Sequence, residues 1–142
     1  MTELTLAKAN AIIATALSKA AELKLKPLGI VVLGPGGHPV ALQKQDGASL
    51  LRTEIASGKA YGALAVGSGS RALSKTAIDR PHFFQGLSGV SGGKIVPVPG
   101  GVLIRAKSGA ILGAVGVSGD TSDNDEAVAI AGIEAAGFTA EG

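Results

Sequence analysis

Two pairs of short apolar runs, each split by a glycine-containing turn, place the strongest constraint on how this chain folds. The runs span residues 28–33 and 40–43 around a turn at 34–38, and residues 102–106 and 110–117 around a turn at 107–109. Glycine allows positive φ in such turns, and Pro35 removes a backbone donor from the first of them. The pattern predicts two β-hairpins.

Helical spacing of apolar residues marks three other segments. In residues 6–23 the apolar side chains recur at three- and four-residue steps, with Thr5 placed to cap the start and Pro27 to prevent continuation. Residues 49–66 carry glycines and alanines that leave a smooth strip for a close-packed neighbour. A last helix is predicted for residues 122–136.

The segment between residues 71 and 99 has no clear period, because prolines and glycines interrupt its apolar residues. It predicts irregular structure with one or two short helical turns. The element order is then helix, two strands, helix, irregular segment, two strands and helix. This order predicts an α+β fold, in which an antiparallel sheet built from two hairpins is flanked by helices within one domain at residues 1–142.

Composition excludes several classes of protein. Thirteen basic and eleven acidic side chains give a net charge of +2, far below what phosphate-backbone binding uses, so no nucleic-acid partner is expected. The absence of cysteine excludes disulfides, thiolate nucleophiles, iron–sulfur clusters and covalently attached haem. No segment approaches the ~18 apolar residues of a membrane span, so we expect a soluble, cytoplasmic protein with no membrane partner.

Small residues dominate the apolar content, since aromatic residues make up only 3% of the chain and glycine contributes 22 residues. Burial per residue is therefore low, and close packing of backbones has to compensate. Chains of this kind often gain stability by assembling, so a homo-oligomer is expected.

Two motifs carry weak functional signals. Residues 89–93 match the G-x-S-x-G letters of a serine hydrolase, but both histidines precede Ser91, whereas the α/β-hydrolase order needs one after it. The acidic run at 120–126 offers oxygen ligands for a cation but lacks the spacing of a calcium loop. Acidic residues also gather where helices begin, because the dipole favours negative charge there. That interpretation is preferred, and no metal site is predicted.

The two histidines are candidates for binding or proton transfer. His38 follows two glycines in the first predicted turn, where the backbone can approach a ligand closely. His82 precedes Phe83 and Phe84, which would supply the apolar wall of a small-molecule pocket. Either imidazole is able to ligate haem iron or to shuttle protons, and a purely structural role is the alternative for each. The structural role is preferred for His38, and His82 is favoured as the functional histidine because of the two aromatic residues beside it.

Four charged residues form a second group of candidates. Asp46 ends the first hairpin and Lys59 lies within the small-residue strip, so folding that joins them would give a structural ion pair or a proton-transfer pair. The structural pair is preferred. Arg80 and Arg105 are candidates for holding a carboxylate substrate through their planar guanidinium groups.

Several short motifs, taken in order along nearly the whole chain, resemble those of the GlcG/HbpS-type haem-binding family. They are Gly36-Gly37-His38, Gln45-Asp46-Gly47-Ala48, Gly58-Lys59-Ala60, Pro99-Gly100-Gly101-Val102, the run Gly113 to Gly119, Asp125-Glu126 and Ala131-Gly132. The resemblance implies one domain with an antiparallel sheet flanked by helices, assembled into homo-oligomers. Some relatives bind haem, and one branch is attached to cobalamin-processing enzymes.

Three hypotheses of function follow. The first is a cytoplasmic, homo-oligomeric small-molecule binding protein, with haem or a related tetrapyrrole as the leading ligand and with His38, His82 and Phe83 as candidate binding residues. The second is an isomerase, hydratase or lyase acting on a small carboxylate. Its candidate catalytic residues are Asp46, Lys59, His82 and Arg105. The third is a non-catalytic assembly module with a large apolar interface. Whether the chain is an enzyme is left open.

Overall fold

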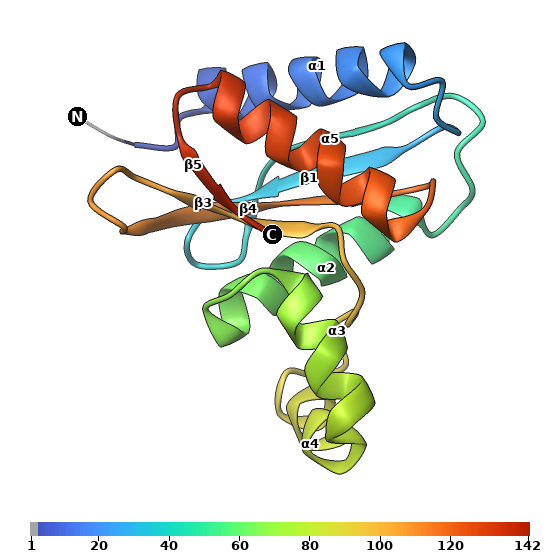
Figure 1. Cartoon of the computed structure of the whole chain (residues 1–142), viewed down its shortest axis with the longest axis vertical. Helices are drawn as coiled ribbons and strands as arrows, with labels where there is room; N and C mark the ends of the chain where they lie inside the picture. Colours follow the sequence, from blue (N-terminus) through green and yellow to red (C-terminus); the bar gives the residue numbers. More distant parts are fainter. Residues whose placement is uncertain (1–2) are drawn as a thin grey trace.

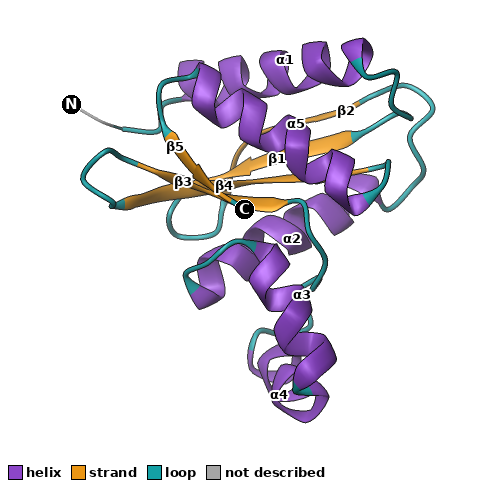
Figure 2. Ribbon diagram, viewed as in Figure 1, coloured by secondary structure: helices purple, strands orange, loops and turns teal. Residues whose placement is uncertain are grey.

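A five-stranded antiparallel sheet with helices on both faces forms the body of the molecule (Figure 1; Figure 2). The computed structural model describes residues 3–142. The strand order is β2-β1-β4-β3-β5. The elements are α1 (Leu6–Glu22), β1 (Gly29–Leu33), β2 (Pro39–Lys44), α2 (Arg52–Val66), α3 (Ser70–Asp79), α4 (Pro81–Val90), β3 (Gly101–Arg105), β4 (Ile111–Ser118), α5 (Ser122–Ala135) and β5 (Thr139–Glu141).

Both predicted hairpins are confirmed. β1 pairs with β2, β3 pairs with β4, and β1 also pairs with β4, so the two hairpins join into one sheet along β1 and β4. The short strand β5, which the sequence pattern did not predict, adds antiparallel to the free edge of β3. The predicted α+β fold is therefore confirmed.

The three predicted helices are also confirmed as α1, α2 and α5. The hydroxyl oxygen of Thr5 accepts a hydrogen bond from the backbone N–H of Lys8 at 3.1 Å, which is the expected cap of α1. At α5 the cap is Thr121, whose hydroxyl accepts from the N–H of Asn124 at 3.2 Å. Within residues 3–142, no helix is long and apolar enough to cross a membrane.

The prediction of irregular structure for residues 71–99 is wrong for most of that segment. It contains two ten-residue helices, α3 and α4, which extend away from the sheet (Figure 1). Pro81 does not break a helix there, because it occupies the first position of α4, where its missing N–H would have no partner in any case. Gly86 and Gly89 lie inside α4, where glycine lowers helix stability without ending the helix.

The sheet separates two apolar layers because successive side chains of a strand point to opposite faces. On β1, Ile30 and Val32 face α1 and α5, whereas Val31 and Leu33 face α2. Alanines supply most of the α2 contribution to its layer. The second layer is therefore thin, and α2 lies very close to the strands.

Glycines on the strands make this close approach possible. A Cβ atom at Gly116 would collide with the carbonyl oxygen of Ala56, and one at Gly101 would collide with the carbonyl oxygen of Lys59. At Gly29 it would lie 2.9 Å from the carbonyl carbon of Arg52. Since these atoms belong to the backbone of α2, the helix rests on bare strand backbone along its length.

A buried ion pair at the middle of α2 adds to this contact. The Nζ atom of Lys59 donates to the carbonyl oxygen of Val117 at 2.9 Å and to Oδ2 of Asp125 at 3.2 Å. The two side chains are only 3% and 1% exposed. Burial lowers the pKa of Lys59 and raises that of Asp125, while the attraction between the two charges opposes both shifts. The pair joins α2, β4 and α5.

A side chain at Gly116 is expected to separate α2 from the sheet. Gly116→Ala should lower the free energy of unfolding by about 1–3 kcal/mol or more, because the helix backbone has no room to yield. Gly86→Ala is the matched control, since a Cβ atom there meets nothing within 4 Å. It should be neutral or stabilising by up to about 1 kcal/mol. Denaturant unfolding measures both, and equal effects would contradict the proposed contact.

Breaking the buried Lys59–Asp125 pair is expected to destabilise the protein more than breaking an exposed ion pair. Lys59→Met should destabilise the protein by about 3–5 kcal/mol, because it leaves Asp125 buried without its cation. The double variant Lys59→Met/Asp125→Asn should recover part of that loss. Lys75→Met, which breaks an exposed pair with Asp79, should cost less than about 1 kcal/mol. Denaturation midpoints compare the variants, and strictly additive effects of the two substitutions would count against the pairing.

Candidate functional site

A groove beside the β1–β2 turn gathers the side chains best suited to binding a ligand. It has a volume of about 270 Å³ and is lined by Gly36, Gly37 and His38 from the turn, Ser57 and Tyr61 from α2, and Lys94. A smaller cleft of about 150 Å³ shares Gly36, Gly37 and Tyr61 with it and continues toward Pro35, Leu64 and Ala65. We call these two together the His38 groove.

The turn that carries His38 is held against α2 by a glycine. Gly37 has a φ of 85°, and a Cβ atom there would lie 3.0 Å from Cε2 of Tyr61. The N–H of Gly34 donates to the carbonyl oxygen of His38 at 2.9 Å, and the N–H of Gly37 donates to that of Gly34 at 3.0 Å. The turn therefore packs on the Tyr61 ring and presents the exposed imidazole of His38 beside it.

The opposite wall of the groove is the segment that follows α4. The N–H of Val96 donates to the carbonyl oxygen of Gly58 at 3.1 Å, and a Cβ atom at Gly58 would lie 3.0 Å from the carbonyl oxygen of Lys94. Gly62 similarly allows the side chain of Ile95 to approach α2. Residues 94–96 thus pack against the small-residue strip predicted on this helix, and this packing places Lys94 at the groove.

The groove combines three kinds of group that suit an anionic, partly aromatic ligand. A neutral imidazole binds metal ions, including haem iron, and the Tyr61 ring offers an aromatic surface. The ammonium group of Lys94 lies 5.4 Å from the centre of that ring. Among the described residues no carboxylate lines the groove. Its volume is at or below the lower end of the range for small-molecule sites, so a large ligand would remain partly outside.

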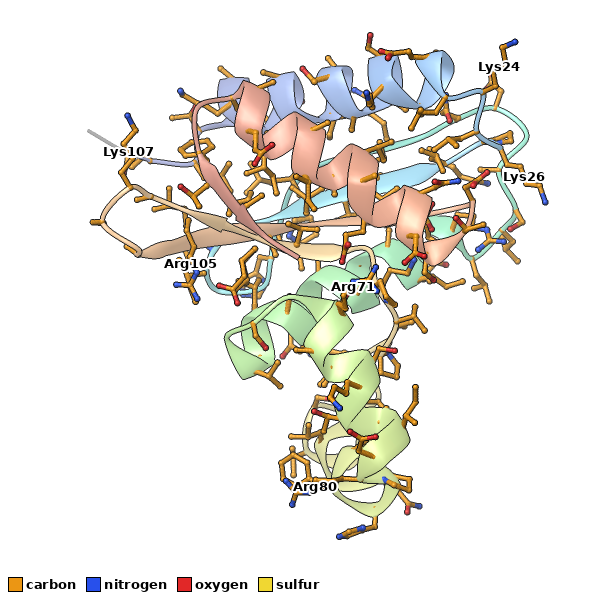
Figure 3. All side chains as sticks on the ribbon, viewed as in Figure 1. Lys24, Lys26, Arg71, Arg80, Arg105 and Lys107 are labelled. Carbon is orange, nitrogen blue, oxygen red and sulfur yellow. The ribbon has the colours of Figure 1, made fainter. Side chains whose placement is uncertain are left out.

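His82 and Phe83 lie elsewhere, on the first turn of α4. Both are exposed, and neither lines the His38 groove. The guanidinium group of Arg80 lies 4.4 Å from the centre of the Phe83 ring. Figure 3 shows Arg80 at the far end of the α3–α4 projection, away from the sheet. The structure therefore separates the two candidate histidines within one chain.

The four residues of the enzyme hypothesis are not brought together. Asp46 lies in the turn after β2 and lines a separate cleft of about 420 Å³. The expected pairing of Lys59 with Asp46 is wrong, because Lys59 faces the sheet and meets Asp125 at the start of α5. Arg105 is bound to Glu141 at 2.7 Å and to the carbonyl oxygen of Gly109 at 2.6 Å. His82 is on α4.

The acidic run at 120–126 lies at the start of α5, as predicted, and its charges are used within the fold. Asp125 belongs to the buried pair, and Glu126 forms a salt bridge with Arg71. Asp120 accepts hydrogen bonds from the side chain of Asn124 and the N–H of Lys26, which lower its pKa to about 2. In residues 3–142 no three histidine or acidic side chains are grouped so as to hold a metal ion.

The sequence patterns also missed contributors to the groove. Ser57, Tyr61 and Lys94 were not singled out, although Tyr61 is the one tyrosine of the chain and stands in a helix of glycines and alanines. A single large polar side chain among such small residues could have indicated that this part of the helix lines a groove. Ser91 of the G-x-S-x-G motif follows α4 and donates to the carbonyl oxygen of Ser88, so it is not on a strand-to-helix turn.

Comparisons with known proteins agree with the motifs. An uncharacterized 15.0 kDa protein of Citrobacter freundii, from the dhaT-dhaS intergenic region, is 30% identical over 126 residues, which cover 89% of this chain and 87% of that protein. The solved structure of a PduOC:haem complex matches with a TM-score of 0.87 at 23% identity over 99% of this chain and all of that one.

Two further solved structures share the fold. The protein ORFY of Klebsiella pneumoniae matches with a TM-score of 0.83 at 25% identity, covering 96% of this chain and 92% of that chain. A variant of HbpS from Streptomyces reticuli matches with a TM-score of 0.80 at 25% identity, covering 95% and 88%. The family model described as "Haem degrading protein HbpS-like" matches residues 4–134, so this chain belongs to the HbpS-like family.

Proposed function

We propose that this chain is a cytoplasmic, homo-oligomeric haem-binding protein and that His38 is the residue that meets the iron. The observation that carries the proposal is the presentation of the His38 imidazole at the mouth of a groove walled by Tyr61 and Lys94. Membership in the HbpS-like family and the likeness to a protein solved as a haem complex support haem as the ligand.

The groups in the groove match the parts of haem. A neutral imidazole donates its lone pair to iron, a ring such as that of Tyr61 packs against a flat macrocycle, and an ammonium group attracts carboxylates. When bound, haem supplies an iron centre able to exchange electrons or bind small ligands. Because the groove is small, part of the macrocycle would stay outside this chain.

His82, with Phe83 beside it, is the second candidate ligand. The pair stands on the exposed face of α4, where a macrocycle would need another surface to cover it. A site there depends on assembly, whereas the His38 groove exists in one chain. This difference makes the two histidines separable by experiment.

Titration of the purified protein with haemin tests the choice of ligand and residue. The unmodified protein should give a saturable shift of the Soret band, His38→Ala should lose most of it, and His82→Ala should retain it. The fold of each variant is checked by its melting temperature, and a protein without haem affinity controls for nonspecific binding. Binding that is weak and equal in all variants would refute the proposal, and loss only in His82→Ala would move the site to α4.

The homo-oligomeric part of the proposal is supported by the exposure of the α3–α4 projection. None of the residues of α4 is buried. Ile78, Phe83 and Val90 are 77%, 42% and 86% exposed, although they are among the larger apolar side chains of this chain. Several large apolar side chains exposed on one projection favour a surface that another molecule covers.

Charging the projection should therefore weaken assembly. Val90→Glu combined with Ile78→Glu is expected to shift the protein toward a smaller species in analytical ultracentrifugation, because two charges would be buried in the interface. Leu50→Glu is the matched control, since Leu50 is 80% exposed but lies before α2. A protein that stays monomeric at all concentrations, or an equal effect of the control, would contradict this placement of the interface.

A further inference from the structure

The charge of the His38 groove comes from one flexible side chain. Lys94 is the one lysine among the residues that line the groove. It is exposed, and within residues 3–142 no salt bridge joins it to a carboxylate, whereas the buried Lys59 of α2 is paired with Asp125. Its ammonium group instead lies over the Tyr61 ring at 5.4 Å from the ring centre. A cation without an anionic partner, placed in a groove without carboxylates, leaves the groove ready for a negatively charged group.

The backbone that carries Lys94 is fixed, although its side chain is free to move. The carbonyl oxygen of Lys94 packs against Gly58, and Val96 is hydrogen-bonded to the carbonyl oxygen of that glycine at 3.1 Å. The anchor point of the side chain is therefore set by α2, which also carries Tyr61. A lysine has a long, flexible stem and three donors, so its charge can shift by a few ångströms while its Cα atom stays in place.

A flat ligand that packs on the face of Tyr61 next to Lys94 would take the place that the ammonium group now holds. Lys94 then loses its cation–π contact with the ring. A carboxylate at the edge of the ligand replaces that contact with a charge-assisted hydrogen bond. A ligand of the same shape without a carboxylate offers no such replacement.

We propose that Lys94 selects ligands that carry a carboxylate, which it holds at the open edge of the groove while His38 meets the metal. The inference rests on the proposed function, since it assigns the propionate side chains of haem to Lys94. It adds a specificity-determining residue and predicts that the groove distinguishes a macrocycle with free carboxylates from its esterified form.

Haemin and its dimethyl ester, titrated against matched variants, test this assignment. Lys94→Met should raise the Kd of haemin about three- to tenfold without moving the Soret maximum of the complex. Lys94→Arg should keep most of the affinity, because it keeps the charge. Lys107→Met, which removes a lysine from the β3–β4 turn (Figure 3), should leave the Kd unchanged.

Titration with the dimethyl ester completes the comparison, because the ester removes the carboxylates from the ligand as Lys94→Met removes the charge from the protein. It should bind the unmodified protein about as weakly as haemin binds Lys94→Met, and Lys94→Met should not weaken ester binding further. Raising the salt concentration should weaken haemin binding to the unmodified protein more than to Lys94→Met, because screening acts on the ion pair.

Three outcomes would overturn the inference. If Lys94→Met and esterification each leave the Kd unchanged while His38→Ala still abolishes binding, the proposed function stands and the role of Lys94 is wrong. If Lys94→Met moves the Soret maximum, Lys94 acts at the iron and not on a carboxylate. If haemin binding does not depend on His38 at all, the proposed function fails and this inference fails with it.

Discussion

The close seating of α2 on the sheet is the contact on which the rest of the molecule depends. Gly29, Gly101 and Gly116 remove side chains where the helix backbone meets β1, β3 and β4. Short distances between backbones give many dispersion contacts, which replace the large side chains that this chain lacks. The buried Lys59–Asp125 pair then ties the middle of the helix to β4 and α5. The glycines of this chain therefore allow close packing of α2 on the strands as well as positive φ in turns.

The same helix also organises the groove, because both walls are positioned against it. The turn at Gly37 packs on Tyr61, and residues 94–96 pack on Gly58 and Gly62 from the other side. Lys59 faces the sheet, whereas Ser57 and Tyr61, two residues away on either side, face the groove. A change that lifts α2 from the strands thus moves Tyr61 relative to His38. Stability and ligand geometry are coupled through one element.

Local patterns were enough to predict the parts whose structure is decided locally. The hairpin turns contain glycines, and Thr5 caps α1, so strands and helices could be placed from neighbouring residues. The two helices of residues 70–90 were missed, because Pro81 and the glycines of α4 look like breakers when their position within a helix is unknown. The partner of Lys59 lies 66 residues away in sequence, and only the sheet topology brings Asp125 to it. The turn was enough to make His38 a candidate, but its groove neighbours Tyr61 and Lys94 come from segments whose contact the sequence does not reveal.

Two of the three phenylalanines of this chain lie on α4, outside the core. The chain has three phenylalanines; Phe138 is buried in the core, while Phe83 and Phe84 both stand on the projection. In a chain so poor in large side chains, the placement of two of them on a helix with no buried residue weakens the core of a lone protomer. Gly86 and Gly89 add to this cost, since they lower helix propensity and meet nothing within 4 Å. A second molecule packed on α4 would gain buried area from the phenylalanines. The exposed apolar residues of the projection are thus the part of the fold that the proposed assembly would bury.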